Sequence, residues 1–260
     1  MLKGLNAIVT GSTSGIGLGI ANVLASKGAN LVINGFGDAA AIEAERANLE
    51  AKYGVKVVYS GADISKPSDV KAMVELCVSS FGSVDILVNN AGIQYTESVE
   101  NFPAERWDAI IAINLSGIFH AIQAALPHMK AKGFGRIINI ASVHGLIGST
   151  HKVAYVAAKH GVVGMSKVVA LETAGTGVTC NTICPGWVHT PLVQKQIEAK
   201  AAEQGISIEQ ATEDLLIAKQ PSKQFATPEQ MGELAAFLSS DAAAQMTGIA
   251  IPVDGGWTAQ

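Results

Sequence analysis

Short apolar runs alternate with helical segments along almost the whole chain, and this alternation limits the possible folds more than any other feature. Parallel strands need a long crossover between them, so repeated strand–helix alternation predicts a parallel sheet covered by helices on both faces, an α/β fold of three layers. Ligands of such sheets bind at the carboxyl ends of the strands. The predicted strands are 7–9, 30–34, 56–61, 84–88, 136–141, 178–184 and 249–253, and predicted helices include 18–27, 39–53, 68–81, 103–130 and 228–238.

Composition excludes several classes of protein. With 260 residues, of which 48% are hydrophobic and 15% charged, the chain predicts one domain over 1–260 with an ample core. A net charge of -4 and the lack of a basic stripe argue against nucleic-acid binding. Cys77, Cys180 and Cys184 lie in apolar patterns without zinc-ligand spacing, which is typical of reduced core residues, and no metal site is expected. Every apolar run is interrupted before about 18 residues and no targeting segment is visible, so we expect no membrane span and a cytoplasmic protein.

A glycine-rich loop, Thr-Gly-Ser-Thr-Ser-Gly-Ile-Gly at 10–17, follows the first predicted strand and precedes the first helix. Glycines at 11, 15 and 17 allow a tight turn, a close approach of backbone to a diphosphate, and packing of the helix on the strand. The free N–H groups and partial positive charge of a helix N-terminus favour phosphate. A glycine trio alone is weak in a chain with 27 glycines, but strand, loop and helix in this order predict nucleotide binding.

Tyr155 and Lys159 lie four residues apart, and a helix places residues at that spacing on one face. An ammonium about 4 Å from a phenol, at an effective dielectric of about 20, is worth about 4 kcal/mol and would lower the pKa of Tyr155 toward neutrality. Tyr155 could then take a proton from an alcohol or give one to a ketone, while Ser142 holds the reacting oxygen. Taken alone, such a pair is more often an ordinary surface pair, so this interpretation depends on the upstream loop.

Five motifs in this order resemble the short-chain dehydrogenase/reductase family: TGSTSGIG at 10–17, NNAG at 89–92, Asn114, Ser142, and YVAAK at 155–159. The resemblance covers essentially the whole chain. It implies a doubly wound (Rossmann) fold with a parallel seven-stranded sheet, a nicotinamide cofactor, and a proton relay of Asn114, Ser142, Tyr155 and Lys159. In this family such an asparagine is associated with a helical irregularity that holds a water beside the lysine. On its own, Asn114 would be a polar residue satisfied by a neighbouring turn.

The residues after the second strand favour NAD over NADP. They read Asn-Gly-Phe-Gly-Asp at 34–38, with no arginine or lysine before Arg46 to pair with a 2′-phosphate. Phe36 stands where the family usually has an acidic residue, so the backbone of Gly35 and Phe36 or the carboxylate of Asp38 remain alternatives for the ribose. With the resemblance, the predicted cofactor-binding residues are Gly11, Thr13, Ser14, Gly15, Ile16, Gly17, Phe36, Asp63, Ile64, Asn90, Tyr155, Lys159 and Thr190.

Three of these residues also have purely structural interpretations. Asp63 could cap a strand end, Asn90 could stabilise its own loop, and Thr190 before Pro191 could be a helix N-cap. The family pattern instead places Asp63 beside the adenine and Asn90 along the adenosine half of the cofactor, and Thr190 could bond the nicotinamide carboxamide. Both interpretations stay open at this point.

Several polar side chains close to the relay predict a carboxylate substrate. Lys152 is the free cation, because Lys159 is committed to the tyrosine and the ribose. With the segments at 144–161, 184–193 and 253–260, this set is similar to the bacterial D-3-hydroxybutyrate dehydrogenases within the family. That similarity implies a tetramer that oxidises D-3-hydroxybutyrate to acetoacetate with NAD. The predicted substrate-binding residues are Gln94, Ser142, His144, Lys152, Tyr155, Trp187, Gln196 and Trp257. Alone, each of Gln94, His144, Lys152 and Gln196 is more often an ordinary exposed residue. Trp187 and Trp257 could equally form the wall of a small pocket or belong to the core.

The segment 187–224 is richer in charged residues and glutamine than its surroundings, and it divides into two amphipathic helical pieces at 192–204 and 208–219. We predict that it forms a lid over the substrate, with a hinge at Pro185 and Gly186. The last strand, at a sheet edge and followed by an apolar tail, favours a homotetramer. Two alternatives remain open: a 3-oxoacyl carrier-protein reductase or sugar alcohol dehydrogenase of the same fold, and a noncatalytic NAD-binding protein.

Overall fold

The structure, a computed structural model, describes residues 2–260. Its strands form one parallel sheet in the order β3-β2-β1-β4-β5-β6-β7, which confirms the predicted seven-stranded α/β fold. The order reverses beside β1, which pairs with β2 on one side and β4 on the other. The strands are β1 Asn6–Val9, β2 Asn30–Asn34, β3 Val57–Ser60, β4 Ile86–Asn89, β5 Gly135–Ile140, β6 Val178–Pro185 and β7 Ala250–Val253.

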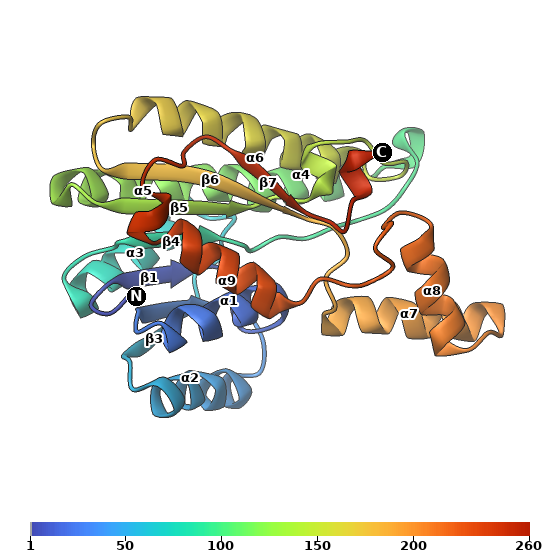
Figure 1. Ribbon diagram of the computed structural model, residues 1–260, viewed down its shortest axis with the longest axis horizontal. Coiled ribbons are helices and arrows are strands. Elements are labelled where there is room, and N and C mark those ends of the chain that lie inside the picture. The colour runs from blue at the N-terminus through green and yellow to red at the C-terminus, as the bar shows by residue number, and fades with distance from the viewer. Residues whose placement is uncertain (1) are drawn as a thin grey trace.

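Helices cover both faces of this sheet (Figure 1). Helices α1 and α9 pack with one hydrophobic cluster on one face, and helices α3, α5 and α6 contribute to a second cluster on the other. The strands read as nearly continuous buried runs because both of their faces are covered. The helices are α1 Gly15–Ser26, α2 Ala39–Tyr53, α3 Pro67–Phe81, α4 Ala104–Ile111, α5 Gly117–Lys132, α6 Val153–Glu172, α7 Pro191–Gln204, α8 Ile208–Ile217 and α9 Pro228–Leu238.

Local signals in the sequence account for the helix ends. Helix α9 begins with a complete capping box, in which the Thr227 side chain accepts from the Gln230 backbone and the Gln230 side chain accepts in return. Helix α2 begins where the Asp38 carboxylate accepts from the Ala41 backbone, and it ends at Gly54 in the left-handed conformation. These caps explain why the predicted bounds of both helices agree closely with the structure.

The predicted helix over 103–130 is divided in two. A π-helical turn at Ala112–Ser116 separates α4 from α5 and contains Asn114. The whole stretch Ala104–Lys132 is long and apolar enough, by composition alone, to cross a membrane, contrary to the expectation that every apolar run is too short. Its apolar residues include Ile118, Ile122 and Met129, which are buried in the hydrophobic cluster between the sheet and α3, α5 and α6. Packing in the core therefore accounts for the apolar composition.

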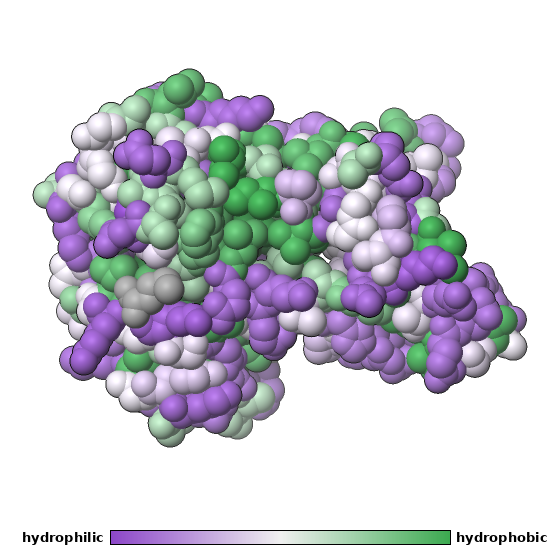
Figure 2. Space-filling view, viewed as in Figure 1, coloured by the Kyte–Doolittle hydropathy of each residue, from purple (hydrophilic) through white to green (hydrophobic). Residues whose placement is uncertain are grey.

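Helices α7 and α8 project from the body of the molecule (Figure 1), and their outward surface is largely hydrophilic (Figure 2). A small cluster of their own, formed by Val193, Ile197, Ala201 and Ala211, holds the two helices together. Both helices lie within the segment predicted as a lid, and α8 ends two residues earlier than predicted, at Ile217.

Candidate active site

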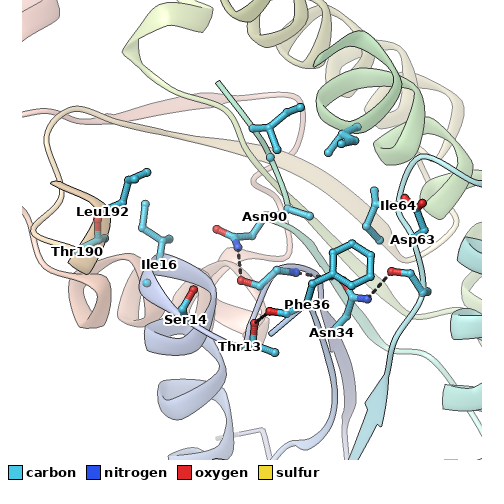
Figure 3. A pocket seen from close by; sticks show the side chains of 18 of the residues that line it. Thr13, Ser14, Ile16, Asn34, Phe36, Asp63, Ile64, Asn90, Thr190 and Leu192 are labelled. Carbon is cyan, nitrogen blue, oxygen red and sulfur yellow. Dashed lines mark hydrogen bonds between the residues drawn. The ribbon is translucent and has the colours of Figure 1, made fainter. Parts of the chain in front are cut away.

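The glycine loop and the carboxyl ends of β1, β2 and β4 form a cavity of about 440 Å³ (Figure 3). It lies where the strand order reverses, the usual ligand position in an open parallel sheet. The predicted cofactor-binding residues that line it are Gly11, Thr13, Ser14, Gly15, Ile16, Phe36, Asp63, Ile64, Asn90 and Thr190.

The N-terminus of α1 supplies the phosphate-binding character of this cavity. The N-cap residue Ser14 makes no side-chain capping bond, and no acidic residue lies in the first turn. The first N–H groups of the helix therefore remain available to an anion, and the helix dipole adds partial positive charge. Gly15 has a positive φ of 55°, a backbone angle that residues with a side chain rarely adopt. Loop, glycine and open helix end together fit the diphosphate of a dinucleotide.

Gly17 does not line the cavity, in contrast to its predicted contact with the cofactor. A Cβ at this position would collide with the Gly11 carbonyl oxygen and lie 2.5 Å from Asn90 Nδ2. Gly17 therefore allows α1 to pack directly behind the loop. Asn90 lines the cavity and also stabilises the loop, because its Nδ2 donates to the carbonyls of Thr10 and Gly11 at 2.9 and 3.1 Å.

At the predicted adenosine end, the Phe36 ring is 70% exposed at the cavity wall. The alternative contact through Asp38 is not supported, because its carboxylate caps α2 and does not line the cavity. Asp63 acts as a local cap, since its Oδ1 accepts from the Ser65 backbone at 3.0 Å. Hydrogen bonds from the Ser65 side chain and backbone lower the pKa of the Asp63 carboxyl group. Among the described residues that line this cavity, none is a lysine or an arginine.

A second cavity of about 610 Å³ contains Ser142, Tyr155 and Lys159. Tyr155 and Lys159 share one face of α6, and Lys159 Nζ lies 5.5 Å from the centre of the Tyr155 ring. Lys159 is buried, and its Nζ donates to the Ile140 carbonyl at 2.7 Å. The spacing of four residues thus brings the predicted proton-transfer groups to one place at the end of β5.

The predicted lowering of the Tyr155 pKa is wrong for this structure. Burial raises the pKa of Tyr155, and the hydrogen bond with Ser142 is the one opposing cause. Burial also lowers the pKa of Lys159, to about 8, so burial disfavours the charged forms of both groups. The simple Coulomb argument from sequence left out this desolvation. Tyr155 is therefore a neutral phenol here, the form that donates a proton to a ketone.

Asn114 lies behind these groups, fully buried in the π-helical turn. Its Oδ1 accepts from the Ile93 backbone at 2.9 Å, and its Nδ2 donates to the Ile93 carbonyl at 2.8 Å. The helical irregularity implied by the resemblance is present. The side chain fastens the loop after β4, which lines both cavities, to the α4–α5 junction.

A third cavity, of about 210 Å³, is lined by every predicted substrate-binding residue. Lys152 Nζ lies 3.4 Å from His144 Nε2, and the Lys152 ammonium also lies 6.0 Å from the Trp187 ring. Burial, followed by the charges of Lys152, Lys219 and His160, lowers the pKa of His144 to about 4. Burial and Lys219 also lower the pKa of Lys152. A neutral imidazole beside an ammonium leaves this small cavity with net positive charge.

Aromatic rings form part of the wall of this cavity beside Lys152 and His144. Trp187 and Trp257 are stacked with ring centres 6.3 Å apart, and Trp257 meets His144 edge-on at 5.5 Å. These two residues therefore belong to the cavity wall, one of the two open interpretations. Thr190 accepts from the Val193 backbone at 3.3 Å and lines both the first and the third cavity, so it is an N-cap with access to the site.

Comparisons with known proteins agree with this geometry. A family model described as enoyl-(acyl carrier protein) reductase matches residues 11–258. The D-beta-hydroxybutyrate dehydrogenase of Cupriavidus necator is 61% identical over 260 residues, all of both chains. The enzyme of the same name from Rhizobium meliloti is 53% identical over 254 residues, 98% of each chain. The chain belongs to the short-chain dehydrogenase/reductase family.

A solved relative supports the same fold for this short-chain dehydrogenase/reductase. The L-sorbose reductase of Gluconobacter frateurii, complexed with NADPH and L-sorbose, superposes with a TM-score of 0.95 at 31% sequence identity. The alignment covers 100% of this chain and 98% of that one. The family thus uses a nicotinamide cofactor, which agrees with the shape of the first cavity.

Several residues around the site of this short-chain dehydrogenase/reductase are not among those predicted from the sequence. Asn34 lines the first cavity and accepts from the Gly11 backbone at 3.2 Å. Tyr95 lines the second cavity, and Leu192 lines all three. Leu192 alone could have been found, because it follows the Thr190-Pro191 helix start. Lys219, whose charge affects both His144 and Lys152, follows a distant helix and is not identifiable from spacing.

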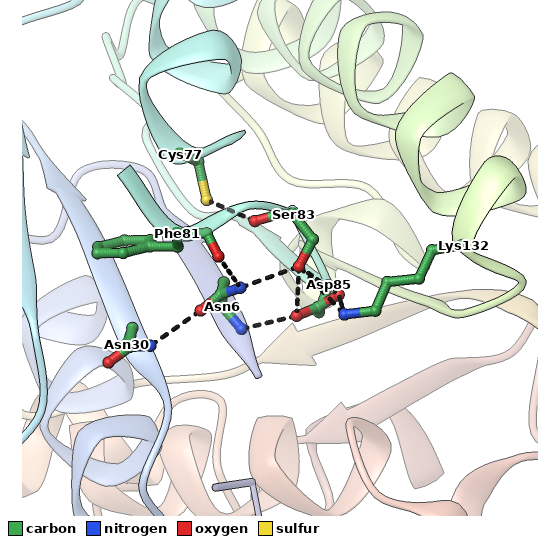
Figure 4. Close-up of polar contacts among 7 residues, drawn as sticks. All are labelled: Asn6, Asn30, Cys77, Phe81, Ser83, Asp85 and Lys132. Carbon is green, nitrogen blue, oxygen red and sulfur yellow. Dashed lines mark hydrogen bonds and ion pairs between the residues drawn. The ribbon is translucent and has the colours of Figure 1, made fainter. Parts of the chain in front are cut away.

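The opposite end of the sheet carries a separate polar cluster (Figure 4). Asp85, fully buried before β4, accepts from the Asn6 backbone at 2.9 Å and from the Ser83 hydroxyl, and it pairs with Lys132 at the end of α5. Asn6 in turn accepts from Asn30 Nδ2. This cluster joins the amino ends of β1, β2 and β4, so it stabilises the fold of this short-chain dehydrogenase/reductase far from the site. Within residues 2–260, no group of three or more His, Cys, Asp or Glu is arranged to hold a metal.

Proposed function

We propose that this oxidoreductase catalyses the NAD-dependent oxidation of D-3-hydroxybutyrate to acetoacetate, and the reverse reaction. The observation that carries the proposal is a cavity of about 210 Å³ that Lys152, His144 and Tyr155 line together. Its volume suits a small acid, and its lysine suits a carboxylate. The 61% identity to the Cupriavidus necator enzyme of that name supports the same substrate.

The carboxylate of the substrate would lie against Lys152. Among the described residues, Lys152 takes part in no ion pair, so its ammonium is available to a ligand. Gln94 and Gln196 line the same cavity and can donate from their amide groups. Burial favours the neutral form of His144, so its imidazole can accept or donate without adding a second charge. Trp187 and Trp257 would exclude water and pack against the carbon chain of the substrate.

Ser142 and Tyr155 would then bind the C3 oxygen. NAD, when bound along the glycine loop, supplies the nicotinamide that accepts a hydride from C3. For oxidation, Tyr155 takes the hydroxyl proton, and for reduction it returns one to the ketone. Because burial raises the pKa of Tyr155, the protein in this state is prepared for ketone protonation, and oxidation should become faster as the pH rises. Lys159, together with the water that the family resemblance implies beside Asn114, would carry the proton onward.

The cofactor preference rests on charge. A 2′-phosphate would lie near Gly35 and Phe36, where the lining residues provide no cation. The N–H groups of α1 and the backbone near Phe36 fit the diphosphate and ribose of NAD. A ratio of kcat/KM for NAD over NADP near one would contradict this part of the proposal.

We also propose that 187–224 acts as a lid on a single domain and that the protein is a cytoplasmic homotetramer. Leu192 and Gln196 extend from α7 into the cavities, so motion of this helix would open or close the site. Strand β7 is a sheet edge, and hydrophobic residues gather over it (Figure 2). Another subunit would cover such an edge. Light scattering that gives the mass of one chain at micromolar concentration would contradict the tetramer.

One assay tests the function. The purified protein is incubated with NAD and a panel of D-3-hydroxybutyrate, L-3-hydroxybutyrate, a sugar alcohol and a 3-hydroxyacyl thioester, and NADH formation is followed at 340 nm. The proposal expects the highest kcat/KM with D-3-hydroxybutyrate. A preference for the thioester or the sugar alcohol would favour those dehydrogenases instead, and no turnover with any of them would favour a noncatalytic NAD-binding protein.

A further inference from the structure

The two ends of the 187–224 segment are joined at its base. Where the chain leaves β6, the Trp187 carbonyl accepts from the Ala226 backbone N–H at 2.9 Å. The Ala226 carbonyl accepts from the His189 backbone N–H at the same distance. Val188 and Ala226 form an isolated parallel bridge. The outgoing and returning chains are thus side by side before α7 begins. Motion of α7 and α8 would leave this base in place.

One buried side chain completes the base. Gln220 follows α8 and is 1% exposed. Its Oε1 accepts from the Trp187 backbone at 3.0 Å, and its Nε2 donates to the Gln224 carbonyl. A single amide therefore binds the outgoing chain with its acceptor and the returning chain with its donor. Among side chains of this length, only an uncharged amide offers one group of each kind.

The C-terminal tail packs on the same amide. A Cβ at Gly186 would lie 2.8 Å from Gln220 Oε1, and a Cβ at Gly255 would lie 2.7 Å from Gln220 Cγ. The Ser222 backbone donates to the Gly255 carbonyl at 3.0 Å. Two residues further on, the tail reaches Trp257. Gln220 therefore contacts the segments that carry both aromatic walls of the substrate cavity.

Asp254 orders that tail. Its Oδ1 accepts from the Gly256 backbone at 3.0 Å, and its Oδ2 accepts from the Thr258 backbone at 2.8 Å. With the tail held from one side and Trp187 held by Gln220, the two tryptophan rings stack at 6.3 Å. Gln220 itself lines none of the three cavities of the site.

We propose that Gln220 is a positioning residue that holds Trp187 against Trp257 and so sets the shape of the substrate cavity. It acts through the backbone of Trp187 and touches neither substrate nor cofactor. The inference rests on the proposed function only where substrate kinetics are concerned, because the position of the tryptophan rings can be measured without turnover. A displacement of about 1 Å at a reacting site can cost up to about 100-fold in rate, so a loosened wall has a measurable effect.

The test compares Gln220→Met with a matched control. Methionine keeps the volume of glutamine and removes both hydrogen bonds. The control is Gln224→Met, because Gln224 is exposed and its side chain makes no hydrogen bond that the structure describes. All variants carry Trp107→Phe, which leaves Trp187 and Trp257 as the only tryptophans of the chain's three.

For Gln220→Met, we expect the KM for D-3-hydroxybutyrate to rise about tenfold, with the KM for NAD within about twofold. We also expect acrylamide to quench the remaining tryptophan fluorescence at least about twice as strongly as in the parent. Gln224→Met should match the parent in both measurements. Gln220→Leu also removes both hydrogen bonds but has a shorter apolar side chain, and we expect changes in the same direction as for Gln220→Met. If Gln220→Met does not fold, Gln220→Leu decides the question.

Unchanged quenching and unchanged substrate KM in a folded Gln220→Met protein would overturn the proposal. An equal rise in the KM for both substrate and NAD would also overturn it, because that result would indicate general loosening. If the parent does not oxidise D-3-hydroxybutyrate, the proposed function fails, and the quenching measurement alone decides the role of Gln220.

Discussion

Lys152→Met tests how much of substrate recognition comes from one ammonium. Lys152 is partly buried, has no ion-pair partner among the described residues, and lies beside a neutral His144. A hydrogen bond between this ammonium and a carboxylate is worth about 1.5–3 kcal/mol. Since about 1.4 kcal/mol corresponds to a factor of ten, we expect kcat/KM for D-3-hydroxybutyrate to fall by about 10- to 150-fold.

The control for this change is Lys167→Met, on the exposed face of α6, the helix that Lys152 precedes as N-cap. Steady-state kinetics are measured for both variants with D-3-hydroxybutyrate and with 2-butanol, an alcohol of similar size without a carboxylate. We expect Lys167→Met to match the parent, and Lys152→Met to lose activity only toward the acid. A loss of less than about threefold toward the acid, or equal losses toward both alcohols, would refute the carboxylate-binding role.

Two predictions concern stability, measured by urea unfolding at fixed protein concentration. The pKa of His144 is lowered to about 4 from 6.5, so its stabilising effect is complete above pH 6.5 and is lost as the pH falls toward 4. The loss should be about 2 kcal/mol at pH 5, and it should be absent in His144→Gln but retained in His151→Asn, which changes an exposed histidine. Lys132→Met removes the cationic partner of buried Asp85, which keeps two other donors, and should destabilise by about 1–3 kcal/mol. Lys130→Met, an exposed change in the same turn, should cost less than about 0.5 kcal/mol, and equal effects of the two lysine changes would contradict the role of the pair.

The fold and the cofactor end of the site are predictable from sequence because their signals are local. Strand, glycine loop and helix follow one another within 6–26, and the caps of α2 and α9 lie within a few residues of each helix start. Spacing of four residues is enough to bring Tyr155 and Lys159 to one helix face. Such features need no knowledge of tertiary packing.

Properties that depend on packing could not be predicted in the same way. The direction of the Tyr155 pKa was wrong because desolvation depends on what surrounds the ring, which spacing does not show. Gln220 lies more than thirty residues from Trp187, and nothing in the local sequence relates the two. For Gly17 the motif indicated both cofactor contact and helix packing, and only the structure shows that this residue lies behind the loop and does not line the cavity.

The central claim is that Tyr155 transfers the proton at C3. It is tested most directly by the kcat of Tyr155→Phe for oxidation of D-3-hydroxybutyrate with saturating NAD. The phenyl ring keeps the packing of α6 and removes only the hydroxyl, so NAD affinity should stay within about threefold while kcat falls by about 100- to 10,000-fold. A kcat within about threefold of the parent would contradict the claim.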